Sequence, residues 1–185
     1  MVTTNYNPDS YREQTTNSLI ETHPFKPFVP SGIKYLIIGS FPGKIHTQQK
    51  PSNADWFYGS KRNTFWKILE EVYGIPLPDR SSKQELFTKL KMGIADIILK
   101  AVRKEGTNAD TNLHIIEYNE TAIKMILKSH NITTIFFTGK FVEKIFIKLF
   151  PGLTNKVVLP SPSPRFATMS LKEKVSVYKK LLPKI

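Results

Sequence analysis

The sequence predicts an α/β fold in which one parallel sheet is covered by helices on both faces. Short, almost uninterrupted apolar runs end at glycine or at polar residues, which is typical of strands buried on both sides. These runs alternate with longer segments whose apolar residues recur at helical spacing, and such alternation favours parallel strands. The length of 185 residues suits one compact domain.

Four strands and five helices are expected, in the order strand–helix–helix–strand–helix–strand–helix–strand–helix. The strands are expected at 34–40, 93–98, 133–139 and 156–161. The helices are expected at 61–74, 83–92, 119–130, 140–150 and 171–182. This order predicts a three-layer α/β/α sandwich around a central four-stranded parallel sheet.

Local signals support these elements in turn. The first strand, KYLIIGS, is an apolar run that a glycine ends, and Gly74 is placed to stop the helix at 61–74. The apolar stripe of that helix consists of Phe65, Trp66, Leu69, Val72 and Tyr73. Asn119 is a plausible cap for the third helix. The fourth helix has an apolar face on one side and a stripe of Lys140, Lys144 and Lys148 on the other. This stripe is most simply a solvated face, and contact with DNA is the other interpretation.

The segments outside these elements are polar. Residues 1–33 become spaced by prolines, which predicts an extended N-terminal arm with little regular structure before a single domain at 34–185. A long polar loop is expected at 44–60, and a second one follows the strand at 93–98.

Charge and composition narrow the classes of function. The chain has 27 Lys and Arg against 15 Asp and Glu, a net charge of +12. This excess favours a polyanionic partner, because basic side chains release counterions from phosphates, although a solvated lysine-rich surface would also explain it. The absence of cysteine excludes disulfides and thiolate chemistry, and the four histidines show no paired ligand spacing, so we expect no metal site. Without an apolar run of ~20 residues or a signal-peptide core, a soluble, cytoplasmic protein is expected.

The loops after the parallel strands should share one rim, because ligands of such sheets bind beyond the carboxyl ends of the strands. GSFPG follows the first strand, at 39–43, and matches neither a dinucleotide-binding nor a phosphate-binding glycine loop. Gly39 and Gly43 would let the backbone approach a ligand, and Phe41 could offer an aromatic face. The alternative is a tight turn whose phenylalanine packs in the core.

The segment FYGSKRNTFW, at 57–66, interleaves aromatic and basic residues, which suits a nucleobase and its phosphates. Phe65 and Trp66 match the apolar stripe of their helix, so core packing is favoured for both. Asn63 could cap this helix, or, if Ser60 is the cap, its amide could point at the rim.

Two further features belong to the same rim. LPSPSPRFA, at 159–167, is stiffened by three prolines and could bind phosphate oxygens, or it could simply connect to the last helix. Asp96 is the only carboxylate inside a predicted strand, and it could orient a water molecule or be a buried structural group.

Together, GSFPG, FYGSKRNTFWKIL and LPSPSP resemble the uracil-DNA glycosylase superfamily over residues 34–182. They look most like the branch of hypoxanthine (deoxyinosine) DNA glycosylases, with mismatch-specific uracil glycosylases as the next relatives. That branch reads G-S-[MF]-P-G, Y-x-x-x-R-N-x-F-W and L-P-S-[TP]-S-P. The resemblance implies an α/β/α sandwich, no cofactor, and an enzyme that excises an aberrant base from DNA. We also expect a monofunctional enzyme and a monomer. Such an enzyme would flip a deaminated base, uracil or hypoxanthine, out of damaged or mismatched DNA and excise it.

The resemblance also implies roles for individual residues. Other branches carry an Asp or Asn inside the first motif to position water, where this chain has Ser40-Phe41-Pro42, and a His or Asn where it has Leu159. The similar branch instead uses an Asn in the second motif, here Asn63, as the catalytic residue. The implied base pocket comprises Gly39, Ser40, Phe41, Pro42, Gly43 and Tyr58, with Phe41 and Tyr58 stacking on the base. The implied DNA-binding residues are Lys61, Arg62, Ser161, Ser163 and Arg165.

Some features depart from that branch. Its His-Pro before the Arg-Asn is Ser60-Lys61 here, and the loop at 44–56 is longer than usual, so base selectivity is expected to differ. A lysine Schiff base through Lys44 or Lys61 is not expected. The rival interpretation is a nucleic-acid-binding module of the same fold without catalysis.

Overall fold

The structure is a computed structural model that describes residues 19–48, 56–104 and 109–185. Its central sheet contains β2 (Tyr35–Gly39), β3 (Met92–Asp96), β6 (Thr134–Phe137) and β7 (Lys156–Val158). The order across the sheet is β3-β2-β6-β7, and every neighbouring pair is parallel. The predicted four-stranded parallel sheet is therefore confirmed.

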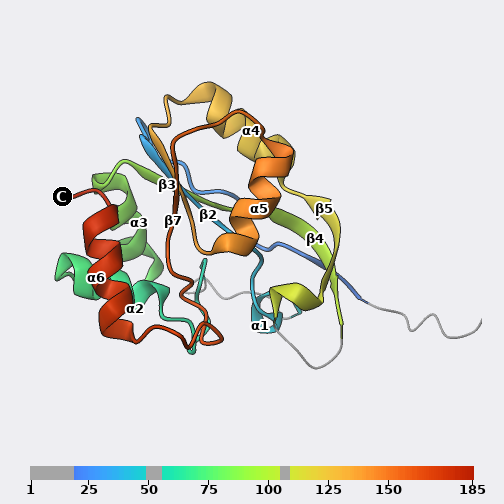
Figure 1. Cartoon of the computed structure of the whole chain (residues 1–185), viewed down its shortest axis with the longest axis horizontal. Helices are drawn as coiled ribbons and strands as arrows, with labels where there is room; N and C mark the ends of the chain where they lie inside the picture. Colours follow the sequence, from blue (N-terminus) through green and yellow to red (C-terminus); the bar gives the residue numbers. More distant parts are fainter. Residues whose placement is uncertain (1–18, 49–55, 105–108) are drawn as a thin grey trace, which may run out of the picture.

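Helices cover both faces of this sheet (Figure 1). On one face lie α2 (Phe65–Tyr73), α3 (Arg80–Lys89) and α6 (Leu171–Leu181). On the other lie α4 (Glu120–Ser129) and α5 (Lys140–Leu149). The three layers are those of the predicted α/β/α sandwich.

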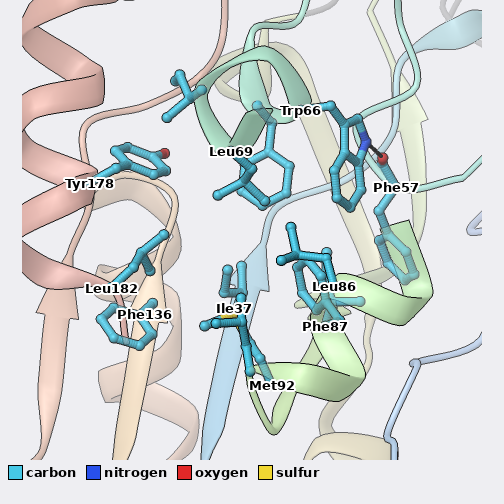
Figure 2. Packing of buried hydrophobic residues seen from close by; sticks show 14 of the residues in the cluster. Ile37, Phe57, Trp66, Leu69, Leu86, Phe87, Met92, Phe136, Tyr178 and Leu182 are labelled. Carbon is cyan, nitrogen blue, oxygen red and sulfur yellow. Dashed lines mark hydrogen bonds between the residues drawn. The ribbon is translucent and has the colours of Figure 1, made fainter. Parts of the chain in front are cut away.

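Successive side chains of β2 point to opposite faces and so divide the core in two. Ile37 belongs to the cluster under α2, α3 and α6, whereas Leu36 and Ile38 belong to the cluster under α4 and α5. Figure 2 shows the first cluster, with Ile37 and Phe136 of the sheet facing side chains from the three helices. Because both faces are buried, the strand reads as a continuous apolar run rather than an alternating one.

Helix ends deviate from the sequence pattern for local reasons. α2 begins at Phe65 instead of 61, because turns occupy the preceding residues and the Asn63 side chain accepts the Phe65 amide (2.9 Å). It ends at Gly74, as predicted, in the left-handed conformation (φ 65°). α3 begins at Arg80, earlier than expected, because Asp79 and Ser82 form a capping box.

A second sheet, which the sequence pattern does not predict, lies beside the first. It is antiparallel and contains β1 (Ile20–Thr22), β4 (Ile98–Arg103) and β5 (Leu113–Tyr118), in the order β1-β4-β5. The expectation of a polar loop after residue 98 is therefore wrong, as is that of little regular structure for residues 20–22. Only Ile98 and Ala101 of β4 are fully buried, so no long apolar run marks the strand. The long loop expected at 44–60 also contains a short helix, α1 (Lys44–Thr47).

A buried ion pair fastens β1 to β4. Arg103 donates through Nη2 to Glu21 Oε2 (3.1 Å), and both side chains are almost fully buried. Gln48 also donates to Glu21 Oε1 (2.9 Å), and Thr47 donates to the same carboxylate. Burial alone would raise the pKa of Glu21, but the hydrogen bonds from Arg103, Thr47 and Gln48 outweigh it and lower the pKa.

Within the described ranges, no helix is both long enough and apolar enough to cross a membrane.

Glu21→Gln should destabilise the protein by about 3 kcal/mol at neutral pH, because Arg103 would remain buried without its counter-charge. Since the pKa of Glu21 is lowered in the folded state, its stabilising effect exists above the unfolded pKa and disappears as the pH falls through the folded pKa. The deficit, measured by urea unfolding, should therefore shrink in acid. Glu117→Gln is the matched control, because the Glu117–Lys100 pair in the same sheet is exposed, and its effect should stay within about 0.5 kcal/mol. Equal effects of the two substitutions would contradict this assignment.

Candidate active site

The carboxyl ends of the parallel strands bring the sequence motifs to one rim. Gly39 and Asp96, the last residues of β2 and β3, are directly paired in the sheet. Thr138 follows β6, and the loop beginning at Leu159 follows β7. Ligands of open parallel sheets bind at this edge, as the sequence analysis anticipates.

Gly39 is the point at which two functional groups converge. A Cβ at this position would collide with Asp96 Oδ1 and with Tyr58 Oη. Only glycine therefore lets the carboxylate and the phenol approach the end of β2 this closely. The space beside Gly39, where a ligand was expected to approach the backbone, is thus occupied by two side chains of the protein itself.

Two side chains from outside the parallel sheet, those of Asp110 and Arg103, hydrogen-bond to the rest of the GSFPG turn. Ser40 Oγ donates to Asp110 Oδ1 (3.1 Å), and Arg103 Nη2 donates to the Pro42 carbonyl (2.9 Å). The Arg103 guanidinium lies over the Phe41 ring, 5.8 Å from its centroid. Phe41 is half-buried, so neither interpretation, core packing or an exposed aromatic face, describes it fully. Gly43 precedes α1, and its carbonyl accepts the His46 amide.

Tyr58 is fixed in an uncommon backbone conformation for a residue other than glycine (φ 57°). Its ring stacks on Phe65 with a centroid separation of 4.2 Å. Its hydroxyl lies 3.0 Å from Thr138 Oγ1, which in turn lies 3.5 Å from the Ile38 carbonyl. Burial, and then the Asp96 charge, raises the pKa of Tyr58, so the phenol stays neutral.

The second and third motifs are joined by hydrogen bonds. The amide and the hydroxyl of Thr64 both donate to the Pro162 carbonyl, at 3.0 and 2.9 Å. Thr64, not Ser60, is the N-cap of α2, and Asn63 precedes it with its side-chain oxygen on the Phe65 amide. In the described part of the chain, no partner is found for the Asn63 amide nitrogen. Neither foreseen arrangement is found as such, because Thr64 is the cap, but the Asn63 oxygen still accepts a hydrogen bond from the first residue of the helix.

The third motif forms a chain of short turns. Ser161 Oγ accepts the Ser163 amide, and Ser163 Oγ accepts the Arg165 amide, each at 3.3 Å. Both hydroxyls still have a proton to donate. Arg165 is exposed, as are Lys61 and Arg62 in the second motif, so cations from both motifs face solvent. Leu159 is fully buried and plays a packing role.

Two residues of the site were not singled out from the sequence. His23 donates from Nε2 to Asp96 Oδ2 (2.8 Å), and Asp110, in the 3-10 helix η2 (Asp110–Asn112), accepts from Ser40. They lie 73 and 70 residues from those partners in the chain, so no local pattern links them. The proline-spaced segment around His23 was the only signal available.

Two other points concern the chemistry that the site could support. No group of three or more His, Asp or Glu able to hold a metal occurs among the described residues. Part of the expected long loop at 44–56, namely 49–55, lies outside those residues, as do residues 1–18 of the expected arm.

Asp110→Asn should stabilise the protein increasingly as the pH rises from about 4 to about 7. Burial raises the pKa of Asp110 to about 6. The negative charge of Asp96 also raises this pKa, whereas the hydrogen bond from Ser40 lowers it. The folded state then binds a proton more tightly than the unfolded state, so this group lowers stability as it ionises through that range. The asparagine keeps the oxygen that accepts from Ser40 but cannot ionise. Thermal melts across this pH range measure the difference.

Asp79→Asn serves as a control of opposite sign. The hydrogen bond from the Ser82 backbone amide is the main cause that lowers the pKa of Asp79. The ionised carboxylate therefore stabilises the folded state at neutral pH, and its replacement should destabilise the protein there. A pH-independent effect of Asp110→Asn would contradict the burial of a titrating carboxyl at the rim.

Comparisons with known proteins bear on the family and the fold. The family model for the uracil DNA glycosylase superfamily matches residues 26–183. A search of curated proteins finds no match. The solution NMR structure of a candidate uracil DNA glycosylase from Methanosarcina acetivorans has the same fold, with a TM-score of 0.63 and 24% sequence identity. The similarity covers 88% of this chain and 99% of that one. The family model spans most of the chain, including all three motifs of the rim, and the protein therefore belongs to the uracil DNA glycosylase superfamily.

Proposed function

We propose that this protein is a monofunctional DNA glycosylase that excises a deaminated base, uracil or hypoxanthine, by hydrolysing its N-glycosidic bond. The observation that carries the proposal is that three motifs, all within the part of the chain that matches the superfamily, lie at one rim. Tyr58 of the second motif packs against Gly39 of the first, and Thr64 of the second donates to Pro162 of the third. The net charge of +12 and the exposed Lys61, Arg62 and Arg165 support DNA as the substrate. We expect a monomer that acts in the cytoplasm, at the nucleoid if the source is bacterial.

The reaction requires the target nucleotide to leave the duplex, since its glycosidic bond is inaccessible in the base stack. Phe41 and Tyr58 would stack on the flipped base, and the backbone of residues 39–43 would bind its edge. Tyr58 is already held by Phe65 and Thr138, so its ring would not need to be ordered when the base binds. The hydroxyls of Ser161 and Ser163 would donate to phosphates on either side of the lesion.

Cleavage of the bond between base and sugar leaves positive charge on the sugar. Asn63 would position the hydrolytic water and stabilise this charge through the dipole of its amide, because an amide does not act as a base at neutral pH. Its oxygen is engaged by the Phe65 amide, so the amide nitrogen is the group assigned to the water. Hypoxanthine is included beside uracil as a candidate base because the branch that this chain resembles carries such an Asn in its second motif.

A non-catalytic DNA-binding module is the second candidate. It is favoured by the absence of an acid or amide from the GSFPG turn and by the burial of Leu159 where other branches have a polar residue. The two candidates differ in one observable, the release of free base from DNA.

Asn63→Asp should slow single-turnover excision about 10²- to 10³-fold, because it removes the amide donor and keeps an oxygen for the Phe65 amide. DNA binding and the melting temperature should change little, whereas Asn63→Ala should also lose about 1 kcal/mol of stability, because the Phe65 amide loses its acceptor. The assay is base release from duplexes containing uracil, hypoxanthine or xanthine.

Asn131→Asp, an exposed substitution of the same charge before β6 and away from the rim, is the matched control and should keep the wild-type rate. An Asn63→Asp protein as fast as wild type would overturn the assignment of Asn63. Binding to damaged duplexes without release of any base by the wild type would establish the non-catalytic module instead.

A further inference from the structure

Asp96 carries a buried oxygen that the protein itself does not satisfy. The residue is 6% exposed, and its Oδ2 accepts a hydrogen bond from His23 Nε2 (2.8 Å). Its Oδ1 is buried and has no hydrogen-bond partner in the part of the chain that the structure describes. Buried acceptors are nearly always paired, so an unpaired one at the carboxyl edge of the sheet calls for an explanation.

The oxygen lies at the centre of the rim. It approaches the Cα of Gly39 from the side of β3, and Tyr58 Oη approaches the same position. Tyr58 Oη is hydrogen-bonded to Thr138 Oγ1 and forms no hydrogen bond with Asp96 Oδ1. The missing donor must therefore come from outside the described protein groups.

His23 determines which carboxylate oxygen is left open. The Phe25 backbone amide donates to His23 Nδ1 (3.1 Å), so Nδ1 carries no proton and the ring proton must be on Nε2. Nε2 then donates to Asp96 Oδ2 and fixes the plane of the carboxylate. The imidazole is packed against Phe25, Phe41 and Phe57, with ring centroids 5.9, 6.0 and 5.4 Å away. Both the tautomer and the orientation of His23 are thus set before any substrate binds.

The segment that supplies His23 lies before the start of the family match at residue 26. His23 directly follows β1, and its amide donates to the Leu99 carbonyl of β4 (2.8 Å). The buried Glu21–Arg103 pair holds the same strand in place. Arg103 also donates to the Pro42 carbonyl, so β1 is connected to the GSFPG turn through Arg103 and to Asp96 through His23.

We propose that His23 is a positioning residue of the active site. It holds Asp96 so that Oδ1 accepts a hydrogen bond from a donor that arrives with the substrate. Two donors have the required chemistry: a ring N–H of the flipped base and the hydrolytic water. The inference rests on the function proposed above, and it makes the N-terminal strand part of the site.

The test compares His23→Ala, His23→Gln and Asp96→Asn in single-turnover excision from duplex DNA. His23→Ala should slow excision about 10- to 100-fold, the effect of losing one hydrogen bond to a charged group. His23→Gln should restore most of the rate, because its amide can donate to Oδ2. In the Asp96→Asn background, His23→Ala should cost little more, since the two residues act as one unit.

A merely structural role for His23 predicts a different pattern, in which the rate follows the melting temperature and the two substitutions add. Additive losses, or a wild-type rate in His23→Ala, would overturn the proposal. His130→Gln, which removes a histidine at the end of α4 instead, should leave the rate unchanged.

N-methylated lesions separate the two donors. If Oδ1 binds a ring N–H, the preference for uracil over 3-methyluracil should fall in His23→Ala and Asp96→Asn. If it orients water, both variants should lose the same factor on every substrate. Either result supports the proposal and identifies the donor.

If the wild type excises no base, the proposed function fails, and binding decides the role of His23. The wild-type preference for a duplex with a non-cleavable 2′-fluoro lesion should then fall in His23→Ala and return in His23→Gln. An absent or unchanged preference would overturn the proposal.

Discussion

The close approach of Asp96 and Tyr58 to the Cα of Gly39 is the constraint on which the rest of the site depends. The register of β2 and β3 brings Asp96 beside Gly39, and the missing side chain leaves space for a carboxylate and a phenol. Tyr58 reaches this point only through a left-handed backbone conformation and its stacking on Phe65. The first and second motifs are therefore joined by one steric condition, and the proposed base pocket is built around it.

The antiparallel sheet has a function beyond covering one side of the core. β4 carries Arg103, which binds Glu21 of β1 and the Pro42 carbonyl, so the GSFPG turn is stabilised from outside the parallel sheet. The 3-10 helix between β4 and β5 supplies Asp110 to Ser40. These contacts fix the turn in the free protein, which would reduce the ordering cost of binding the proposed flipped base.

Sequence patterns predicted the features that depend on local order along the chain. The strands β2, β3 and β6 are buried on both faces, so their continuous apolar runs predicted the central sheet. The ends of these runs predicted the position of the rim. β4 and β5 bury little and carry charged residues, so their pattern resembled a loop. His23 and Asp110 act only through partners some 70 residues away, and such long-range hydrogen bonds leave no periodic signal.

We propose that a damaged base binds at the rim formed by Gly39, Tyr58 and Asp96. The most direct test is a crystal structure of the protein with a duplex that carries a 2′-fluoro analogue of deoxyuridine or deoxyinosine. We predict a flipped base between Phe41 and Tyr58, with phosphates near Ser161 and Ser163. A duplex bound instead along the exposed lysine stripe of α5, with every base stacked, would contradict the account.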